Sequence, residues 1–174
     1  MNPFKRILAG LALAFVTALS FAPQVQAQAL TDYAENRLVD AIFRGQTLGA
    51  PATFYVALFT TACSDSAAGT EVSTSGTGYA RAAVASSLAN WAGTQSAGST
   101  TASSGTGGQT SNNSTITIGS ATTTSWGSVS HFGLFDASTA GNMWVCQALT
   151  TAKTINAGDA LPSFNAGALT ITFQ

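Results

Sequence analysis

The alternation of apolar and polar residues predicts a central hairpin in the second half of the chain. Ser128–Asp136 (SVSHFGLFD) is apolar on both faces in its middle, as expected for a strand covered on both sides. Ala137–Gly141 (ASTAG) is a turn-rich break of a length common in hairpins, and Asn142–Thr150 (NMWVCQALT) is a second apolar strand. Two of the three tryptophans, the single histidine and one of the two cysteines lie in or beside this hairpin. We therefore place it at the centre of a β-sheet core.

Leu30–Arg44 (LTDYAENRLVDAIFR) is predicted to be the one helix that follows the N-terminal apolar run. Thr31 can cap its first turn, where Asp32 and Glu35 suit the positive end of the helix dipole. Gly45 then fits the position just after the helix, where glycine is favoured. Apolar residues at helical spacing form a stripe typical of a helix packed on a core: Leu30, Ala34, Leu38, Ala41 and Ile42.

Further short strands are predicted from runs rich in β-branched and aromatic residues and, at Tyr79–Ser87, from alternation of the side chains between two faces. They are Thr53–Thr60, Glu71–Ser73, Tyr79–Ser87, Ser114–Ile118, Lys153–Asn156 and Ala168–Phe173. Thr94–Ser114 is a low-complexity Ser/Thr/Gly/Asn segment, and we predict a long mobile loop there. About six to eight strands after one capped helix predict a mainly β fold, an antiparallel β-sandwich of jelly-roll-like type with one N-terminal α-helix.

The N-terminus has the three parts of a secretory leader. Lys5 and Arg6 precede the uncharged apolar run Ile7–Ala22, and Val25-Gln26-Ala27 offers small residues at the positions that a signal peptidase reads. The run is shorter than the roughly 20 residues that span a bilayer comfortably. We expect residues 1–27 to be a signal-peptide-like leader, with an uncleaved anchor as the alternative, and residues 28–174 to form a single domain.

The net charge of the chain limits the classes of molecule that it is expected to bind. Without Lys5 and Arg6 the chain carries four basic and seven acidic residues, so its net charge is −3. No basic patch is available to neutralise phosphates, which argues against nucleic-acid binding. Charged residues make up only 7% of the chain, and Ser, Thr, Gly, Ala and Asn take their place. Such a surface offers little repulsion against association of subunits, so partners are expected among copies of the chain or other structural proteins.

The two cysteines, Cys63 and Cys146, allow two interpretations. In an oxidising compartment a pair of cysteines is read first as one disulfide, which would tie the end of the first strand to the second strand of the hairpin. Assembly in the cytoplasm would instead favour two buried free thiols. The sequence leaves both open.

Candidate catalytic chemistry is sparse. His131 is the one candidate proton shuttle, but Asp136 lies five positions away, on the opposite face of a regular strand. No serine or cysteine lies in a strand–turn–helix elbow. One histidine and two separated cysteines cannot form a closed zinc site, and Gly105, Gly107 and Gly108 lead into no helix that could hold phosphate. Loop carboxylates that could approach calcium are not densely grouped: Asp65, Glu71, Asp136 and Asp159. We predict no catalysis, no metal and no cofactor.

The tryptophans are the other candidates for ligand contact. Trp144 and Trp126 are expected to pack in the core. Trp91 lies beside polar turns and is the best candidate for an exposed aromatic side chain that faces a ligand such as a carbohydrate.

From Ala29 onward the chain resembles a family of small structural proteins of tailed bacteriophages, described as tail-fibre-like. The resemblance depends on the order of several segments, among them LTDYAENRLVDAIF, TFYVALFTTACSDSAAGTEV, GYARAAV, SLANWAGTQ, TSNNSTITIG, SWGSVSHFGLFDASTAGN, ALTTAKTINAGDALPSF and AGALTITF. It implies a non-enzymatic virion component, oligomeric and built on a β-sandwich. It implies no catalytic residues.

One departure from the family leaves two functions open. Virion proteins assemble in the cytoplasm, whereas a secretion-type leader precedes Ala29 here. The first hypothesis is a structural virion protein, either tail-fibre-like or a particle-surface subunit. The second is an exported filament subunit or adhesin that uses the same sandwich, located outside the cell and free of the membrane after leader removal. A carbohydrate-binding module is a third, weaker hypothesis.

Overall fold

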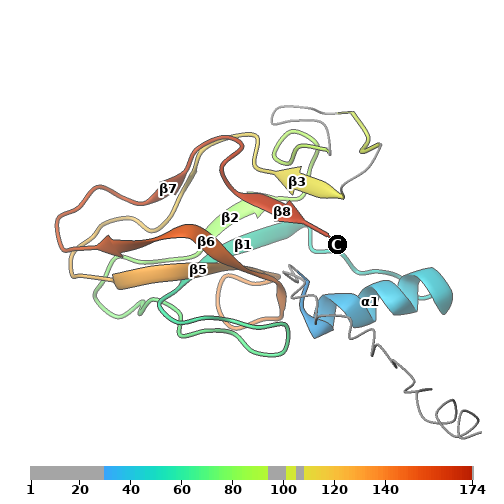
Figure 1. Ribbon diagram of the computed structural model, residues 1–174, viewed down its shortest axis with the longest axis horizontal. Coiled ribbons are helices and arrows are strands. Elements are labelled where there is room, and N and C mark those ends of the chain that lie inside the picture. The colour runs from blue at the N-terminus through green and yellow to red at the C-terminus, as the bar shows by residue number, and fades with distance from the viewer. Residues whose placement is uncertain (1–29, 94–100, 105–107, 174) are drawn as a thin grey trace, which may run out of the picture.

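The computed structural model describes residues 30–93, 101–104 and 108–173, so the predicted leader lies outside the described part. Its centre is an antiparallel sheet of four strands in the order β2-β1-β5-β6 (Figure 1). Their bounds are Thr53–Phe59 for β1, Ala82–Ala85 for β2, Gly127–Phe135 for β5 and Met143–Ile155 for β6. The predicted hairpin, β5 and β6, occupies one half of this sheet.

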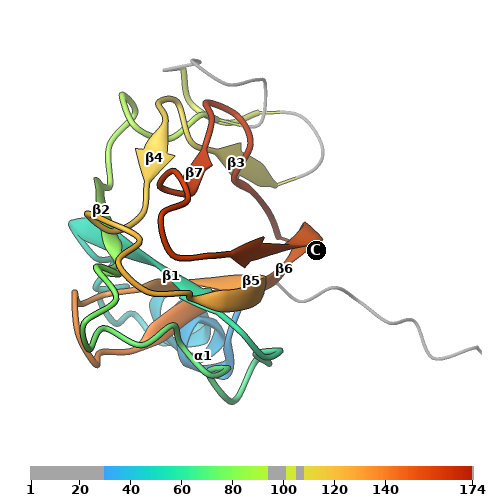
Figure 2. The same cartoon turned by 90° about the vertical axis from the view of Figure 1, so that its left-hand side faces the viewer.

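Two short antiparallel ribbons form a second layer over one face of the sheet (Figure 2). Gln109–Ser111 (β3) pairs with Thr170–Thr172 (β8), and Ile116–Thr117 (β4) pairs with Ser163–Phe164 (β7). The single helix, α1, lies on the opposite side of the sheet. The mainly β, antiparallel fold with one N-terminal helix is thus confirmed, in a sandwich arrangement whose second layer is broken into ribbons.

Apolar side chains of β1 alternate between the two faces of the central sheet, and both faces are covered. Val56 and Leu58 point into the main core between the sheet and the ribbons, together with Ile116, Ile118, Phe132, Leu134, Leu169 and Ile171. Ala57 and Phe59 point to the other face, where they pack with Phe135, Met143 and Cys146. Side chains two residues apart share a face in a strand, so a run that is apolar on both faces belongs in the middle of such a layered structure.

The hairpin has the predicted connection but a longer second strand. β6 continues through Ile155, so the separate strand predicted at Lys153–Asn156 is wrong; a register shift between Val129 and His131 of β5 lets β6 carry extra residues before pairing resumes. Asp136 closes the turn, since its carboxylate accepts bonds from the backbone and side-chain N–H groups of Asn142 at 2.7 and 2.8 Å. Partial burial raises the pKa of Asp136, but these bonds outweigh it and hold the pKa below its usual value.

Helix α1 spans Asp32–Phe43 and is capped as predicted. The Thr31 side chain accepts from the Ala34 N–H, and Gly45 has a positive φ of 67° just past the C-cap. Thr31 also donates to the Met143 carbonyl, which fixes the start of α1 beside β6. The apolar stripe only partly faces the core, because Ala34 is buried whereas Ile42 is 67% exposed.

A disulfide joins Cys63, in the segment after β1, to Cys146 of β6, with the two Cα atoms 6.0 Å apart. The bridge passes the intervening strand β5, whose Phe132 carbonyl lies 3.9 Å from the Cys63 sulfur. It belongs to the second, smaller cluster, with Ala57 and Phe59, where Cys146 is buried and Cys63 is partly buried. The disulfide therefore links the segment after β1 to β6 across β5.

The predicted loop Thr94–Ser114 contains structure that its composition conceals. Residues 94–100 and 105–107 lie outside the described part, but Gln109–Ser111 is strand β3 and Asn112 is fully buried. The Asn112 amide donates to the carbonyls of Ser114 and Asn165, each at 2.8 Å, and its oxygen accepts from the Leu169 N–H at 2.9 Å. The prediction of a loop over residues 94–114 is therefore wrong at the C-terminal end of that segment.

Replacing Asn112 by alanine is expected to lower the free energy of unfolding by about 2–3 kcal/mol, because backbone groups of Ser114, Asn165 and Leu169 lose a partner that lies in the interior. Chemical denaturation measures the change. Asn165→Ala, at an exposed position in the same corner, is the matched control and is expected to change stability by under about 0.5 kcal/mol. Equal losses in the two variants would contradict the role assigned to Asn112.

Candidate functional site

His131 lies in β5, paired with Phe59 and Ala148, and is half-buried. Its Nδ1 is 2.9 Å from the hydroxyl of the adjacent Ser130. Within the described ranges no carboxylate forms an ion pair with the ring. The histidine is thus held by a local hydrogen bond, and the structure does not bring it together with Asp136, which is occupied at the hairpin turn.

The four loop carboxylates are placed apart, each with its own role. Glu71 binds Arg81, Asp136 holds Asn142, Asp159 accepts from the Asn156 N–H at 2.7 Å, and the carbonyl of Asp65 accepts from Asp32. Among residues 30–93, 101–104 and 108–173, no group of three or more His, Cys, Asp or Glu side chains is arranged to hold a metal ion.

Glu71 and Arg81 form the most buried ion pair of the described chain. Arg81 donates to both carboxylate oxygens at 2.8 and 2.7 Å, and its remaining nitrogen donates to the carbonyls of Ala137 and Ala140. Tyr79 also donates to Glu71, and its hydroxyl accepts from the Leu58 N–H. Burial, with the negative charge of Glu71 beside it, raises the pKa of Tyr79 far above its usual range. This cluster links the β1–β2 connection to strand β1 and to the β5–β6 turn, and it is structural.

Trp91 is half-buried and packs its edge against Phe54, with ring centroids 6.4 Å apart. It lines an apolar hollow of about 460 Å³ with Leu88 and Phe173, which are 59% and 48% exposed. Trp126 and Trp144 are buried, and the Trp126 indole donates to the Thr77 carbonyl at 3.0 Å. Because Trp91 packs against the core, less of its ring is exposed than in an isolated surface tryptophan. Its contact with a ligand stays a prediction.

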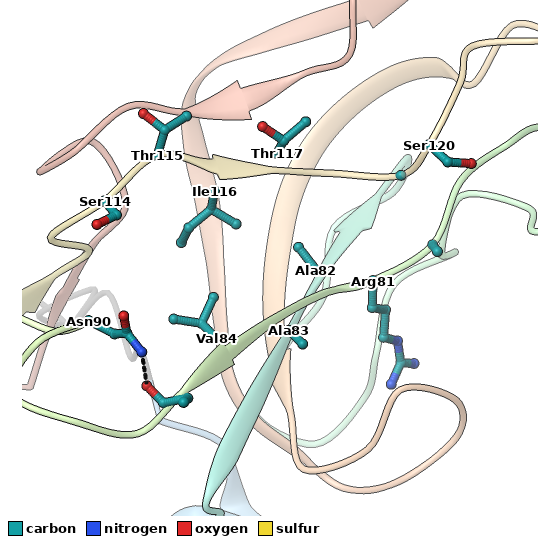
Figure 3. A pocket seen from close by; sticks show the side chains of 13 residues that line it. Arg81, Ala82, Ala83, Val84, Asn90, Ser114, Thr115, Ile116, Thr117 and Ser120 are labelled. Carbon is teal, nitrogen blue, oxygen red and sulfur yellow. Dashed lines mark hydrogen bonds between the residues drawn. The ribbon is translucent and has the colours of Figure 1, made fainter.

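A groove of about 430 Å³ separates the edge of β2 from the edge of β4 (Figure 3). We call it the β2–β4 groove; its walls are residues 82–85 and 114–117. Figure 3 shows Val84 and Ile116 pointing toward one another across its floor, and both are buried. The other residues of the two walls are small and neutral, and Figure 3 shows Thr115 and Thr117 pointing away from Val84.

The outer face of α1 is the largest exposed apolar feature of the helix. Val39, Ile42 and Phe43 are 49%, 67% and 80% exposed, and they lie on one side of the helix at i, i+3 and i+4. In Figure 1 this end of α1 projects beyond the sheet. Of these three residues, only Ile42 belongs to the apolar stripe that the sequence predicts to pack on the core. Val39 and Phe43 are not part of that stripe.

Comparison with known protein families matches residues 29–172 to the family described as podophage GP4 fiber I protein gp80. The chain belongs to this family. The match covers every described element from α1 to β8, so the family unit is the whole sandwich. No curated protein matches the chain.

Membership in this fibre family makes the chain a structural phage fibre protein, of a class located in the virion and associated with other virion structural proteins. In the part of the chain that the structure describes, no helix is both long enough and apolar enough to cross a membrane.

Proposed function

We propose that the chain is a tail-fibre-like or particle-surface subunit of a tailed bacteriophage, and that its copies associate through the outer face of α1. The observation that carries this proposal is the exposure of Val39, Ile42 and Phe43 on one helix face. Large apolar side chains gathered on a surface are typical of protein interfaces. The low charge of the chain, 7% of residues, adds little repulsion between copies.

The charged side chains of α1 do not oppose such packing. Arg44 pairs with Asp40 at 3.2 Å, and Arg37 lies over the Tyr33 ring with its guanidinium carbon 5.5 Å from the centroid. Both interactions occur within the helix, so neither charge requires a partner from another subunit. Association of two copies would remove Ile42 and Phe43 from water, and each fully buried side chain of this size contributes about 1.5–3 kcal/mol.

The double substitution Ile42→Ser with Phe43→Ser is expected to weaken self-association at least about tenfold, because it removes the apolar contact without disturbing the core. Light scattering after size-exclusion chromatography, over a range of concentrations, measures the oligomer. Leu88→Ser, at a 59% exposed apolar position away from α1, is the control and is expected to leave association unchanged. A wild-type chain that stays monomeric at all concentrations would contradict the proposal.

A second candidate, an exported filament subunit or adhesin, is favoured by the Cys63–Cys146 disulfide, because disulfides persist in oxidising compartments. The intact mass of the protein decides between the two. Export predicts loss of residues 1–27 and two fewer hydrogens on the cysteines in the culture supernatant, whereas a virion role predicts that the protein is recovered from purified phage particles.

A further inference from the structure

The solvent-facing side of α1 is polar in its first half and apolar in its second half. Four exposed residues follow one another on this side at intervals of three or four positions: Asp32, Asn36, Val39 and Phe43. Ile42, also exposed, lies beside the last two. A partner that covered the first turn would take the Asp32 carboxylate out of water, which costs free energy unless a positive charge meets it. Apolar contact is therefore favourable only over the last turns of the helix.

The rest of the described chain leaves these last turns open. In Figure 1 the C-terminal end of α1 extends past the edge of the sheet. The segment that follows the helix returns along another side of it, because a Cβ at Gly49 would lie 3.7 Å from a guanidinium nitrogen of Arg37. Arg37 is two positions before Val39, which corresponds to about 200° around the helix axis. The exit loop therefore does not cover the outer face of α1.

Two copies of this face are complementary when their helices run in opposite directions. In an antiparallel pair whose twofold axis passes beside Ala41, Val39 of each copy lies opposite Phe43 of the other. A small side chain then meets a large one twice, which is the arrangement that lets two helix surfaces interdigitate. Asn36 falls opposite Gln46, past the end of the second helix, and Asp32 lies farther out still. The polar half of each α1 therefore stays in water.

The charges beside the apolar face favour the same orientation. Asp40 and Arg44 lie one turn apart on one flank of α1. In an antiparallel pair the same flanks of the two helices meet, so Arg44 of one copy comes near Asp40 of the other. Parallel packing would instead place Arg44 beside Arg44 and Asp32 beside Asp32, and like charges repel.

We propose that two copies of the chain form a twofold dimer in which the last turns of their α1 helices pack antiparallel, with Val39 against Phe43. The proposal rests on the proposed self-association through α1 and adds its orientation and its number of copies. A contact of this kind uses the same patch on both copies, so it is complete at two and does not extend into an open chain. Three apolar side chains per copy make a small interface, and we expect the dimer to dissociate on dilution.

Single introduced cysteines test the orientation. The two native cysteines are joined to each other, so an added cysteine is the one free thiol of the chain. In the antiparallel pair the two Ile42 positions are offset by about 3 Å along the helix axes, whereas the two Asn36 positions are offset by about 15 Å. A disulfide needs Cβ atoms within roughly 3.5–4.5 Å of each other.

With diamide as the oxidant, Ile42→Cys is expected to form cross-linked dimers at least about tenfold faster than Asn36→Cys, because its two thiols meet in the dimer. Non-reducing electrophoresis and intact mass measure the products. Asn36→Cys is the matched control, exposed on the same helix one turn away from Val39. Both variants are expected to keep the wild-type melting temperature within a few degrees, since both positions are exposed.

Light scattering of the wild-type chain gives an answer that does not depend on a variant. The mass is expected to rise with concentration and to level off at two copies. Equal cross-linking of the two cysteine variants indicates parallel packing and overturns the antiparallel dimer. Masses beyond two copies, or a wild type that associates while Ile42→Cys does not cross-link, overturn it too. A wild-type chain that stays monomeric is a different result, because it contradicts the proposed self-association as well as its orientation.

Discussion

Removing the Cys63–Cys146 disulfide is expected to lower the free energy of unfolding by about 4–5 kcal/mol. The two cysteines are 83 residues apart in the sequence, so the bridge closes a long loop in the unfolded chain. In the chain-entropy account, closing a loop of that length removes enough freedom from the unfolded state to stabilise the fold by about that amount. Because marginal domains are stabilised by only about 5–15 kcal/mol in total, the loss is a large share of the whole.

Chemical denaturation of the oxidised chain, the reduced chain and Cys63→Ala with Cys146→Ala measures this loss. The reduced chain and the double variant are expected to agree within about 1 kcal/mol, because the cavity made by truncating two small side chains is minor. Reductant added to the double variant is the control and is expected to change nothing. A difference of under about 1 kcal/mol between the oxidised and reduced chains would contradict the expected constraint on the unfolded chain.

Local patterns were sufficient to predict the elements whose determinants lie close together in the sequence. Thr31, the acidic first turn and Gly45 mark the limits of α1, and the structure places them as helix caps. The central hairpin was predictable because its two apolar runs are separated by a short turn-rich segment. Gly133 in the middle of β5 has a reason that is distant in sequence: a Cβ there would lie 2.8 Å from the ring of Phe59 in β1, where the strands pack closely.

Features that depend on distant partners could not be predicted in this way. Asn112 lies in a segment of Ser, Thr and Gly typical of a loop, and its burial depends on Asn165 and Leu169, more than fifty residues away. The two walls of the β2–β4 groove likewise come from separate segments, residues 82–85 and 114–117, whose strands pair with different partners, β1 and β7. In α1 the helical stripe was visible, but the direction in which the helix leaves the sheet decides that Ile42 and Phe43 face water.

Replacing Arg81 by methionine is expected to cost about 3–5 kcal/mol of stability, because it removes one partner of a largely buried ion pair. The Arg81 and Glu71 side chains are 6% and 27% exposed, and the guanidinium carbon lies 3.7 Å from the centroid of the Phe135 ring. Methionine keeps most of the packing volume but leaves the Glu71 carboxylate without its cation, with Tyr79 as its remaining donor, and leaves the Ala137 and Ala140 carbonyls without theirs. The alternation of Tyr79–Ser87 predicted the strand but gave no sign of this pairing.

Arg44→Met is the matched control, since Arg44 pairs with Asp40 on the surface, where the side chains are 71% and 41% exposed. Such exposed pairs contribute about 0–1 kcal/mol, so the control is expected to lose no more than that. Adding Glu71→Gln to Arg81→Met removes the unpaired carboxylate and is expected to recover part of the loss, since an uncompensated charge is what makes the single variant costly. If the double variant is no more stable than Arg81→Met, the cost lies instead in the lost contacts to the two carbonyls and the Phe135 ring.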